Sequence, residues 1–432
     1  MNDLHVLSLN AREAYYSLSA ASADQRNRAL LSMAADLESH ADQLFQQNQL
    51  DITEAEQTGL AAPLLSRLRF GPEKLKQVIA GLHSLAELPD PLGKTTLSRE
   101  LTEGLSLYRV TCPIGVLGII FESRPDALVQ IASLAVKSGN AALMKGGKEA
   151  LRTNRALAAC VVRGIVAAGL PAASIQLLES REDVRNMLRE DELIDLIIPR
   201  GGIDFVLYIM DNSRIPVLGH ADGICHVYID RDADPETACR VALDSKTQNV
   251  SVCNAMETLL VHADIAPSLL PQLAAMLREK GVQLLGDDQT RSIIDCDTAT
   301  EEDWKTEYLD LVLSVRIVPS ISDAIAHINH YGSHHTDAIV TRDQNRASRF
   351  LQQVDSAGVY WNASTRFADG YVYGFGAEVG IATGKIHARG PMGLEGLTTY
   401  KYKLLGAGHI LAEMKSGDRK YTHVDLNRDC PL

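Results

Sequence analysis

The spacing of apolar residues divides the chain into a helical part and two parts in which strands and helices alternate. Over about the first 90 residues, apolar side chains recur with helical spacing, as at Leu30, Met33 and Leu37. The tetrapeptide at 22–25 resembles a capping box, in which a serine side chain accepts a hydrogen bond at the start of a helix. We therefore predict that this part of the chain folds into helices.

A short extended region follows the predicted helices. The turn ELPDPLGK (87–94) contains proline and glycine and ends the helical region. Residues 96–110 are predicted to form a two-stranded hairpin around Glu103 and Gly104. A further extended segment is predicted at 396–405, near the other end of the chain.

From Pro113 onward the pattern becomes that of a sheet covered on both faces. The run PIGVLGIIF is almost continuously apolar, as expected of a parallel strand between two layers of helices. Further strands are predicted at AALMK, SIQLLE, LIDLIIP and ICHVYID, with helices at 126–138 and about 149–168. Strands that alternate with helices of this length predict right-handed crossovers and a doubly wound sheet.

A second alternating series begins after residue 253. Its predicted strands are TLLVH, VQLLG, LVLSVRIV, AIVT and GVYWNA, and helices are predicted near 266–280, 321–331 and 343–354. The chain length of 432 residues also favours more than one domain. The sequence therefore predicts an α/β protein with two doubly wound domains.

Composition and charge exclude several classes of function. The composition, 46% hydrophobic and 22% charged, is typical of a globular protein. A net charge of −13 argues against nucleic acid or an anionic membrane as the main partner, although a local basic pocket could still bind a small anion. No signal-like segment and no run of about 18 apolar residues occurs. We expect no membrane span and a cytoplasmic location.

One of the seven cysteines differs from the others in its surroundings. The cysteines are odd in number, widely spaced and never in a CxxC pair, so neither a disulfide framework nor a zinc ribbon is predicted. Cys253 lies in a polar stretch, directly before the strand-like run ETLLVH and at the junction of the two predicted domains. A catalytic thiolate and a buried structural thiol both remain open from this pattern. The other six cysteines are predicted to be structural.

Two glycine-containing segments follow predicted strands. SGNAALMKGGKEA (138–150) places Lys145 at a strand end before two glycines, and IIPRGG (197–202) places Gly201 and Gly202 in the same situation. Open α/β sheets hold nucleotides and phosphates where a strand ends and a helix begins. Neither segment is a GxGxxG fingerprint or carries a Walker lysine, so a purely structural turn is the alternative.

Histidines cluster in two places without a usual metal-ligand spacing. His220 and His226 form one group, and the second contains four histidines between residues 327 and 335. The sequence HHTD (334–337) suggests a metal site, but its spacing matches no usual ligand set on one helical face. We therefore expect a solvated loop at this place and no metal.

Several long segments together resemble the gamma-glutamyl phosphate reductases, also called glutamate-5-semialdehyde dehydrogenases. This branch of the aldehyde dehydrogenase superfamily carries out the second step of proline synthesis. The segments are PIGVLGIIFESRPD (113–126), IPVLGHADGICHVYID (215–230), the cysteine stretch and YGFGAEVGIATGKIHARGPMGLEGL (373–397). The resemblance implies an aldehyde dehydrogenase-like fold: an NADP-binding domain at 1–95 and 113–232, a catalytic domain at 233–375, and an oligomerisation flap at 96–112 and 385–410.

The resemblance also implies roles for individual residues. Cys253 matches the nucleophile, Lys145 matches a lysine that contacts the adenosine ribose, and Glu307 matches a glutamate that binds the nicotinamide ribose. The residues after Glu307 depart from the family pattern. Lys148 stands where many NAD-dependent relatives have a glutamate for the ribose 2′-hydroxyl. Its positive charge favours a 2′-phosphate, so NADPH is predicted over NADH.

One departure from the superfamily pattern bears on the reaction. Hydrolytic aldehyde dehydrogenases have a glutamate in an ELGGK segment, and this glutamate activates water. The matching place in PVLGHADG (216–223) is Val217, which cannot act as a base. We therefore expect the thioester on Cys253 to exchange with phosphate. The alternatives are a hydrolytic NAD(P)-dependent enzyme, a catalytically idle scaffold and, more distantly, a cysteine hydrolase.

The mechanism implied by the resemblance begins with attack of the Cys253 thiolate on the γ-carbonyl of glutamyl 5-phosphate. Phosphate leaves, and hydride from NADPH reduces the thioester to glutamate 5-semialdehyde. The Cys253 backbone N–H or a side chain of the FESRP turn is expected to stabilise the oxyanion.

The resemblance also suggests residues that bind the substrate and partners of the chain. Arg124, Arg366 and Arg389 lie in matching segments and are candidates for the substrate's anionic groups, although each could equally be a structural arginine. Other copies of the same chain are expected to associate with it as a homo-oligomer. An association with glutamate 5-kinase is left open by the sequence.

Overall fold

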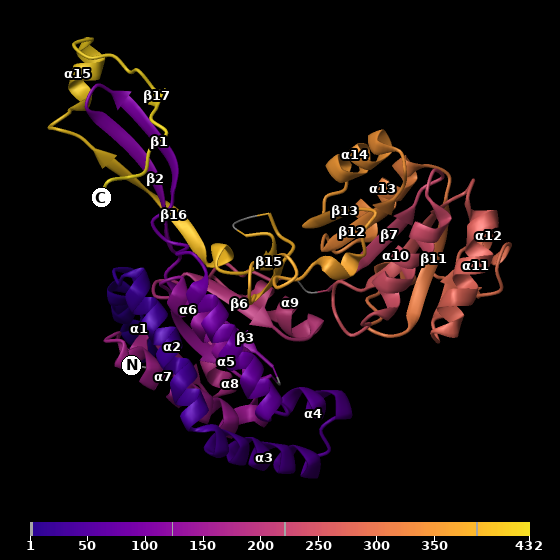
Figure 1. Ribbon diagram of the computed structural model, residues 1–432, viewed down its shortest axis with the longest axis horizontal. Helices are drawn as coiled ribbons and strands as arrows, with labels where there is room; N and C mark the ends of the chain where they lie inside the picture. The colour runs from indigo at the N-terminus through magenta and orange to yellow at the C-terminus, as the bar shows by residue number, and fades with distance from the viewer. Residues whose placement is uncertain (1–2, 123, 220–221, 386–387) are drawn as a thin grey trace. The chain divides into compact units, whose positions relative to one another are not determined.

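The computed structural model describes residues 3–122, 124–219, 222–385 and 388–432. They form two compact units, shown in Figure 1. The first unit contains Met1–Leu218, Phe375–Gly380 and Met392–Leu432, and the second contains Gly219–Gly374 and Ile381–Pro391. No helix in the described ranges is long and apolar enough to cross a membrane.

The first unit begins with the predicted helices. They are α1 (Asp3–Ser19), α2 (Ala23–Ser39), α3 (Ala41–Gln57), α4 (Ala62–Leu68) and α5 (Pro72–Glu87). The predicted helix start at 22–25 is confirmed, because the Ser22 side chain accepts a hydrogen bond from the Gln25 backbone N–H at 3.2 Å. The apolar stripe of α2, which includes Leu30 and Leu37, is fully buried.

A four-stranded parallel sheet forms the centre of the first unit. Its order is β5-β4-β3-β6, with bounds Ile175–Leu178, Ala141–Lys145, Val116–Phe121 and Leu196–Arg200. The helices along it are α6 (Pro125–Lys137), α7 (Leu151–Ala167), α8 (Arg181–Met187) and α9 (Ile203–Asn212). Every residue of β3 and β4 is buried, which confirms the prediction from the apolar runs. The carboxyl ends of β4 and β6 lie on either side of β3, with Lys145 opposite Ile120 and Arg200 opposite Phe121.

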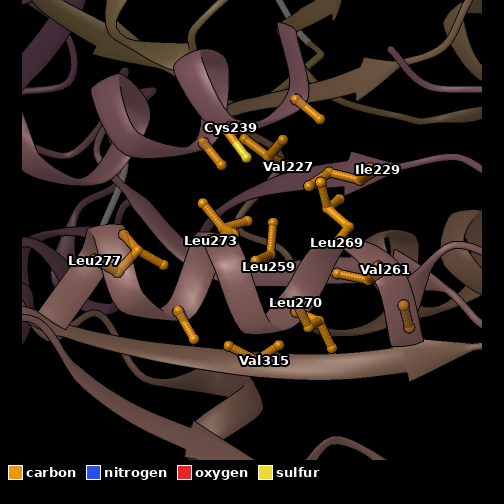
Figure 2. Close-up of a cluster of buried hydrophobic side chains, with 14 of the residues drawn as sticks. Val227, Ile229, Cys239, Leu259, Val261, Leu269, Leu270, Leu273, Leu277 and Val315 are labelled. Atoms are coloured by element: carbon orange, nitrogen blue, oxygen red, sulfur yellow. The ribbon is translucent and has the colours of Figure 1, made fainter. Parts of the chain in front are cut away.

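The second unit is built on a seven-stranded parallel sheet with the order β10-β9-β11-β8-β7-β12-β13. The strands are β7 (Cys225–Ile229), β8 (Met256–His262), β9 (Gln283–Gly286), β10 (Asp297–Thr298), β11 (Val312–Val318), β12 (Thr336–Val340) and β13 (Gly358–Trp361). The helices are α10 (Pro235–Thr247), α11 (Ala266–Glu279), α12 (Asp288–Arg291), α13 (Ile321–Tyr331) and α14 (Gln344–Gln353). Figure 2 shows its main core, where leucines of α11 pack on Val227, Leu259 and Val315.

The expected domain edge at residue 232 is wrong with respect to β7. This strand was predicted to join the first sheet, but it pairs with β8 and β12 in the second. The last pairing to the first sheet is a parallel bridge between Val217 and Ile197, after which the chain enters the second unit at Gly219. An apolar strand that is buried on both faces carries no mark of which parallel sheet it joins. The sequence pattern therefore located the strand but not its partners.

The extended segments form a separate antiparallel sheet, which we call the flap sheet. Its order is β16-β2-β1-β17, with bounds Thr398–Leu405, Leu105–Pro113, Thr95–Thr102 and Val424–Asp425. The predicted hairpin is confirmed, and Gly104 at its turn has a positive φ of 79°. The expected flap boundary at 385 differs from the structure, because residues 385–391 belong to the second unit. The two-residue strand β17 and the short helix α15 (Leu411–Ser416) have no clear periodic signal in the sequence.

Two of the four histidines expected in a solvated loop are buried, whereas His330 is exposed and His334 is half-buried. His335 is 1% exposed and His327 is 5% exposed. Only residues 332–335 connect α13 to β12, so this segment stays close to the sheet. His327 lies on the buried side of α13, with its ring 5.6 Å from Trp304 and 5.4 Å from His226. His220 of the other cluster lies outside the described residues.

Candidate active site

Cys253 lies in a tight turn between a helix and a buried strand. The turn spans residues 252–255, between the end of α10 and the start of β8, and the Ala255 N–H donates to the Val252 carbonyl at 3.0 Å. The Cys253 side chain is half-buried, and none of the seven cysteines forms a disulfide. The buried thiol of Cys225 donates to the Cys253 carbonyl at 3.2 Å. Cys225 therefore has the structural role predicted for it: its thiol stabilises the turn that contains Cys253.

Gly223 brings the start of the second unit directly against this turn. A Cβ atom at position 223 would lie 2.5 Å from the Cys253 Cβ and 2.1 Å from its carbonyl oxygen. Side chains never approach this closely, so the contact requires glycine. The Gly223 N–H donates a hydrogen bond to the Glu307 carboxylate. Cys253 and Glu307, predicted from segments far apart in the sequence, are thus brought together around one glycine.

Glu307 has an unusual protonation equilibrium for a carboxylic acid. Burial and, to a smaller extent, the nearby charge of Asp222 raise the pKa of Glu307 to about 7 against the opposing effect of the hydrogen bond from Gly223. A carboxyl group in this state can change its protonation near neutral pH. It is therefore suited to accept hydrogen bonds from hydroxyl groups above pH 7 more strongly than below it.

Arg366 is the predicted substrate arginine that the structure places near Cys253. It lies in the short 3₁₀ segment Thr365–Phe367, which is tied to the cysteine turn by a 2.7 Å hydrogen bond from the Thr365 hydroxyl to the Asn254 carbonyl. Its Nε donates to the Gln248 side chain at 2.9 Å. Burial lowers the pKa of Arg366, and attraction to Cys253 opposes this shift. A guanidinium in this place can attract a thiolate or an anionic substrate group.

The other two predicted substrate arginines have different surroundings. Arg389 donates to the Asp355 carboxylate at 3.1 Å, to the Asp355 carbonyl and to the Thr383 carbonyl, so its guanidinium ties two segments of the second unit together. Arg124 precedes α6 in the first unit and pairs with the buried Asp126 at 3.3 Å. A side chain of the FESRP turn was expected as an oxyanion donor, and residue 123 of this turn lies outside the described residues.

The strand ends of the first unit carry the predicted cofactor residues. Lys145 is buried at the end of β4 and donates to the Gly146 carbonyl, whereas Lys148 is exposed. Gly202 precedes α9, and a Cβ atom there would meet nothing within 4 Å; at Gly201 it would contact Glu122 and Phe205 at 3.0 Å. An open helix N-terminus after β6 and two lysines, one at the end of β4 and one three residues beyond it, fit an anionic dinucleotide. These residues are therefore suited to hold a nicotinamide dinucleotide.

One group of side chains has metal-ligand chemistry at short range. Asp36, His40 and Cys160 offer ligand atoms within 4.8 Å of one another. The Arg163 guanidinium already occupies this cluster, because it donates to the Asp36 carboxylate at 2.7 Å and to the Cys160 sulfur at 3.2 Å. Burial raises the pKa of Cys160 to about 12, so its thiol is neutral at physiological pH. The cluster is a charge-balanced helix contact.

A buried ion pair beside the cysteine turn was not predicted from the sequence. Lys246, in the last turn of α10, contacts Glu257 of β8 at 2.5 Å, and both side chains are fully buried. The signal was present in METLLVH, since an acidic residue within a strand buried at every position requires a partner. Its partner could not be read from the sequence.

Comparisons with known proteins identify the family of the chain. The model of the aldehyde dehydrogenase family matches residues 2–292. The chain is 55% identical to the gamma-glutamyl phosphate reductase of Pelotomaculum thermopropionicum, covering 99% of this chain and 98% of that protein. It is 52% identical to gamma-glutamyl phosphate reductase 1 of Synechocystis, covering 99% of each.

Solved structures give the same result. The crystal structure of gamma-glutamyl phosphate reductase from Thermotoga maritima is 38% identical, with a TM-score of 0.93 over 95% of this chain and 100% of that chain. The match confirms the aldehyde dehydrogenase-like fold predicted from the sequence. The chain therefore belongs to the aldehyde dehydrogenase family of oxidoreductases and, within it, to the gamma-glutamyl phosphate reductases.

Proposed function

We propose that the protein reduces L-glutamyl 5-phosphate to L-glutamate 5-semialdehyde and phosphate, with NADPH as the reductant, in proline biosynthesis. The names of its relatives support the reductase activity. The observation that carries the residue assignment is the contact of Gly223 with Cys253 on one side and Glu307 on the other. A half-buried thiol beside a guanidinium and a half-buried carboxyl group fits acyl transfer followed by reduction.

Cys253 is the proposed nucleophile. Its thiolate attacks the γ-carbonyl carbon of the substrate, the C–O bond to the phosphate breaks, and phosphate leaves with the bonding electrons. The Arg366 guanidinium attracts the anionic substrate and the thiolate before attack. NADPH, when bound, supplies the hydride that converts the thioester to the aldehyde. When the C–S bond of the reduced adduct breaks, Cys253 returns as the thiolate.

The residues proposed to hold NADPH are those at the strand ends of the first unit and Glu307 of the second unit. Lys145, Lys148, Gly201 and Gly202 would bind the adenosine and phosphate end, and Glu307 would accept hydrogen bonds from the nicotinamide ribose. Arg124 and Arg389 remain predictions as substrate contacts, and their ion pairs give them structural roles.

Phosphate, and not water, is the proposed acceptor of the acyl group in the reverse direction. Val217 stands where hydrolytic relatives have their base, and its half-buried side chain packs against the apolar cluster that contains Ile197 and Ile215. An aliphatic side chain cannot remove a proton from water. Hydrolysis of the thioester is therefore expected to be slow compared with its exchange with phosphate.

The reverse reaction tests this proposal. With glutamate 5-semialdehyde and NADP⁺, continuous NADPH formation should require phosphate, because phosphate discharges the thioester. Cys253→Ala should lower turnover by about 10³-fold or more, with the dissociation constant of NADPH nearly unchanged. Cys430→Ala, which removes a half-buried thiol near the flap sheet, should retain activity. Turnover that is indifferent to phosphate would favour the hydrolytic alternative.

Lys148 tests the cofactor preference. Glutamate at this position would repel a 2′-phosphate and accept a hydrogen bond from a 2′-hydroxyl. Lys148→Glu should shift the ratio of kcat/KM for NADPH over NADH by about tenfold or more toward NADH. Lys280→Glu makes the same charge change at an exposed position of the second unit and should leave the ratio as it is. An unchanged ratio in Lys148→Glu would contradict the assignment.

The flap sheet is the proposed contact between copies of the chain. β16 lies at one edge of this sheet, so only one of its sides is paired. Its alternate residues Tyr400, Tyr402 and Leu404 share one face and are each more than 50% exposed. A row of exposed apolar side chains along an unpaired edge favours association with a second copy.

Substitution on this strand tests the proposed assembly. Tyr402→Lys should lower the molecular mass measured by sedimentation equilibrium, because it places a charge in the proposed contact. Tyr16→Lys alters a similarly exposed tyrosine on α1 and should leave the mass unchanged. Equal masses for Tyr402→Lys and the wild type would exclude β16 from the interface.

A further inference from the structure

The Lys246–Glu257 ion pair has no role in the chemistry proposed above. Both side chains are 0% exposed, and Lys246 Nζ lies 2.5 Å from Glu257 Oε2. Removing two charges from water costs free energy that their attraction often fails to recover, and apolar replacements of such pairs are frequently neutral or stabilising. Stability alone therefore does not explain the pair. Buried ion pairs of this kind are better known for fixing one arrangement of the groups around them.

The second carboxylate oxygen of Glu257 holds the backbone of another segment. Glu257 Oε1 accepts a hydrogen bond from the Leu309 N–H at 3.2 Å. Leu309 has a φ of 51°, in the left-handed region that residues other than glycine rarely adopt. Its side chain is 45% exposed, so burial of this side chain contributes little to holding the backbone there. The hydrogen bond to Glu257 stabilises this conformation.

Lys246 contacts the residue just before Leu309. Its ammonium group lies 5.9 Å from the centre of the Tyr308 ring, a cation–π distance. The Tyr308 hydroxyl is held in turn by Ser314 at 2.7 Å and by Asp303 at 2.9 Å. The ion pair therefore holds two successive residues, and Glu307 immediately precedes them.

The same pair also joins the two ends of the segment that contains the proposed nucleophile. Lys246 lies in the last turn of α10 and Glu257 is the second residue of β8, so their contact joins the two ends of the connection that contains Cys253. Gly223 contacts both Cys253 and Glu307 on the other side. The two segments that must be aligned for reduction, one with the thiol and one with Glu307, thus share a single anchor.

We propose that Lys246 and Glu257 are positioning residues that hold the 307–309 backbone through Leu309 and Tyr308 and thereby set Glu307 at the nicotinamide ribose. This inference rests on the proposed function, because it assigns Glu307 to cofactor binding. Neither residue of the pair touches a reacting atom in this account. Their loss should therefore weaken NADPH binding through Glu307 and leave the fold of the second unit intact.

The first test replaces the pair by apolar residues. Lys246→Met with Glu257→Leu removes both charges together, which leaves no buried ion without a partner. We expect an unchanged circular dichroism spectrum and a dissociation constant for NADPH raised about tenfold. Glu307→Gln should weaken NADPH binding in the wild type but add little in this double variant, because Glu307 is already misplaced there. A purely structural pair would give additive losses, and additivity would overturn the proposal.

The second test acts on the backbone at an exposed position. Leu309→Pro removes the N–H that donates a hydrogen bond to Glu257, and its ring excludes a positive φ. It should weaken NADPH binding by a similar factor and show the same non-additivity with Glu307→Gln. Leu309→Asn keeps the N–H and tolerates the left-handed conformation, so it should bind NADPH like the wild type. Wild-type affinity in Leu309→Pro would overturn the inference, even if the double variant fails to fold.

These outcomes can be separated from failure of the proposed function. If the wild type binds no NADPH, or reduces no acyl phosphate, the proposed function fails. If the wild type binds NADPH and the folded variants bind it equally well, only the positioning role fails.

Discussion

The contact between Gly223 and Cys253 is the constraint on which the candidate active site depends. Any side chain at position 223 would overlap the cysteine turn, because even a Cβ atom would lie 2.1 Å from the Cys253 carbonyl oxygen. The same residue donates its N–H to Glu307. One glycine therefore sets the distance between the thiol segment and the carboxyl group, and the remaining contacts of the site keep those two segments in place.

Those contacts are mostly buried and polar. The cysteine turn is held by the Cys225 thiol, by the Thr365 hydroxyl and by the Asn254 side chain, which donates to the Ala368 carbonyl at 2.9 Å. Each of these bonds contributes about 1 kcal/mol, but each unpaired buried group would cost more. Such a network favours one arrangement over its alternatives. The Lys246–Glu257 pair acts in the same way on both segments at once.

The sequence predicted the parts of this protein that depend on local pattern. Apolar runs located the strands of both sheets, and polar neighbours singled out Cys253. The sheet that β7 joins was predicted wrongly, because an apolar strand does not specify its neighbours. The burial of His327 and His335 was missed for a related reason: the polar residues around them do not show that His327 lies on the buried side of α13 or that the connection before β12 is only four residues long.

Resemblance to a family suggested roles for more residues than the pattern of apolar and polar positions did. It could not show which of several arginines in matching segments lies at the site. Arg366 and Arg389 both lie in matching segments, and only their partners distinguish them. Arg366 interacts electrostatically with Cys253, while Arg389 forms an ion pair with Asp355. The Gly223 contact and the anchor at Leu309 arise from tertiary packing between segments far apart in the chain. No spacing in the sequence reports such contacts.

The most direct test of the account is to observe the acyl group on Cys253 by mass spectrometry. The protein is mixed with glutamate 5-semialdehyde and NADP⁺ without phosphate, quenched in acid and digested. We expect a glutamyl group on the peptide that contains Cys253, stable in phosphate-free buffer and lost when phosphate is added before the quench. An unmodified peptide during continuous NADPH formation, or equal loss with and without phosphate, would contradict it.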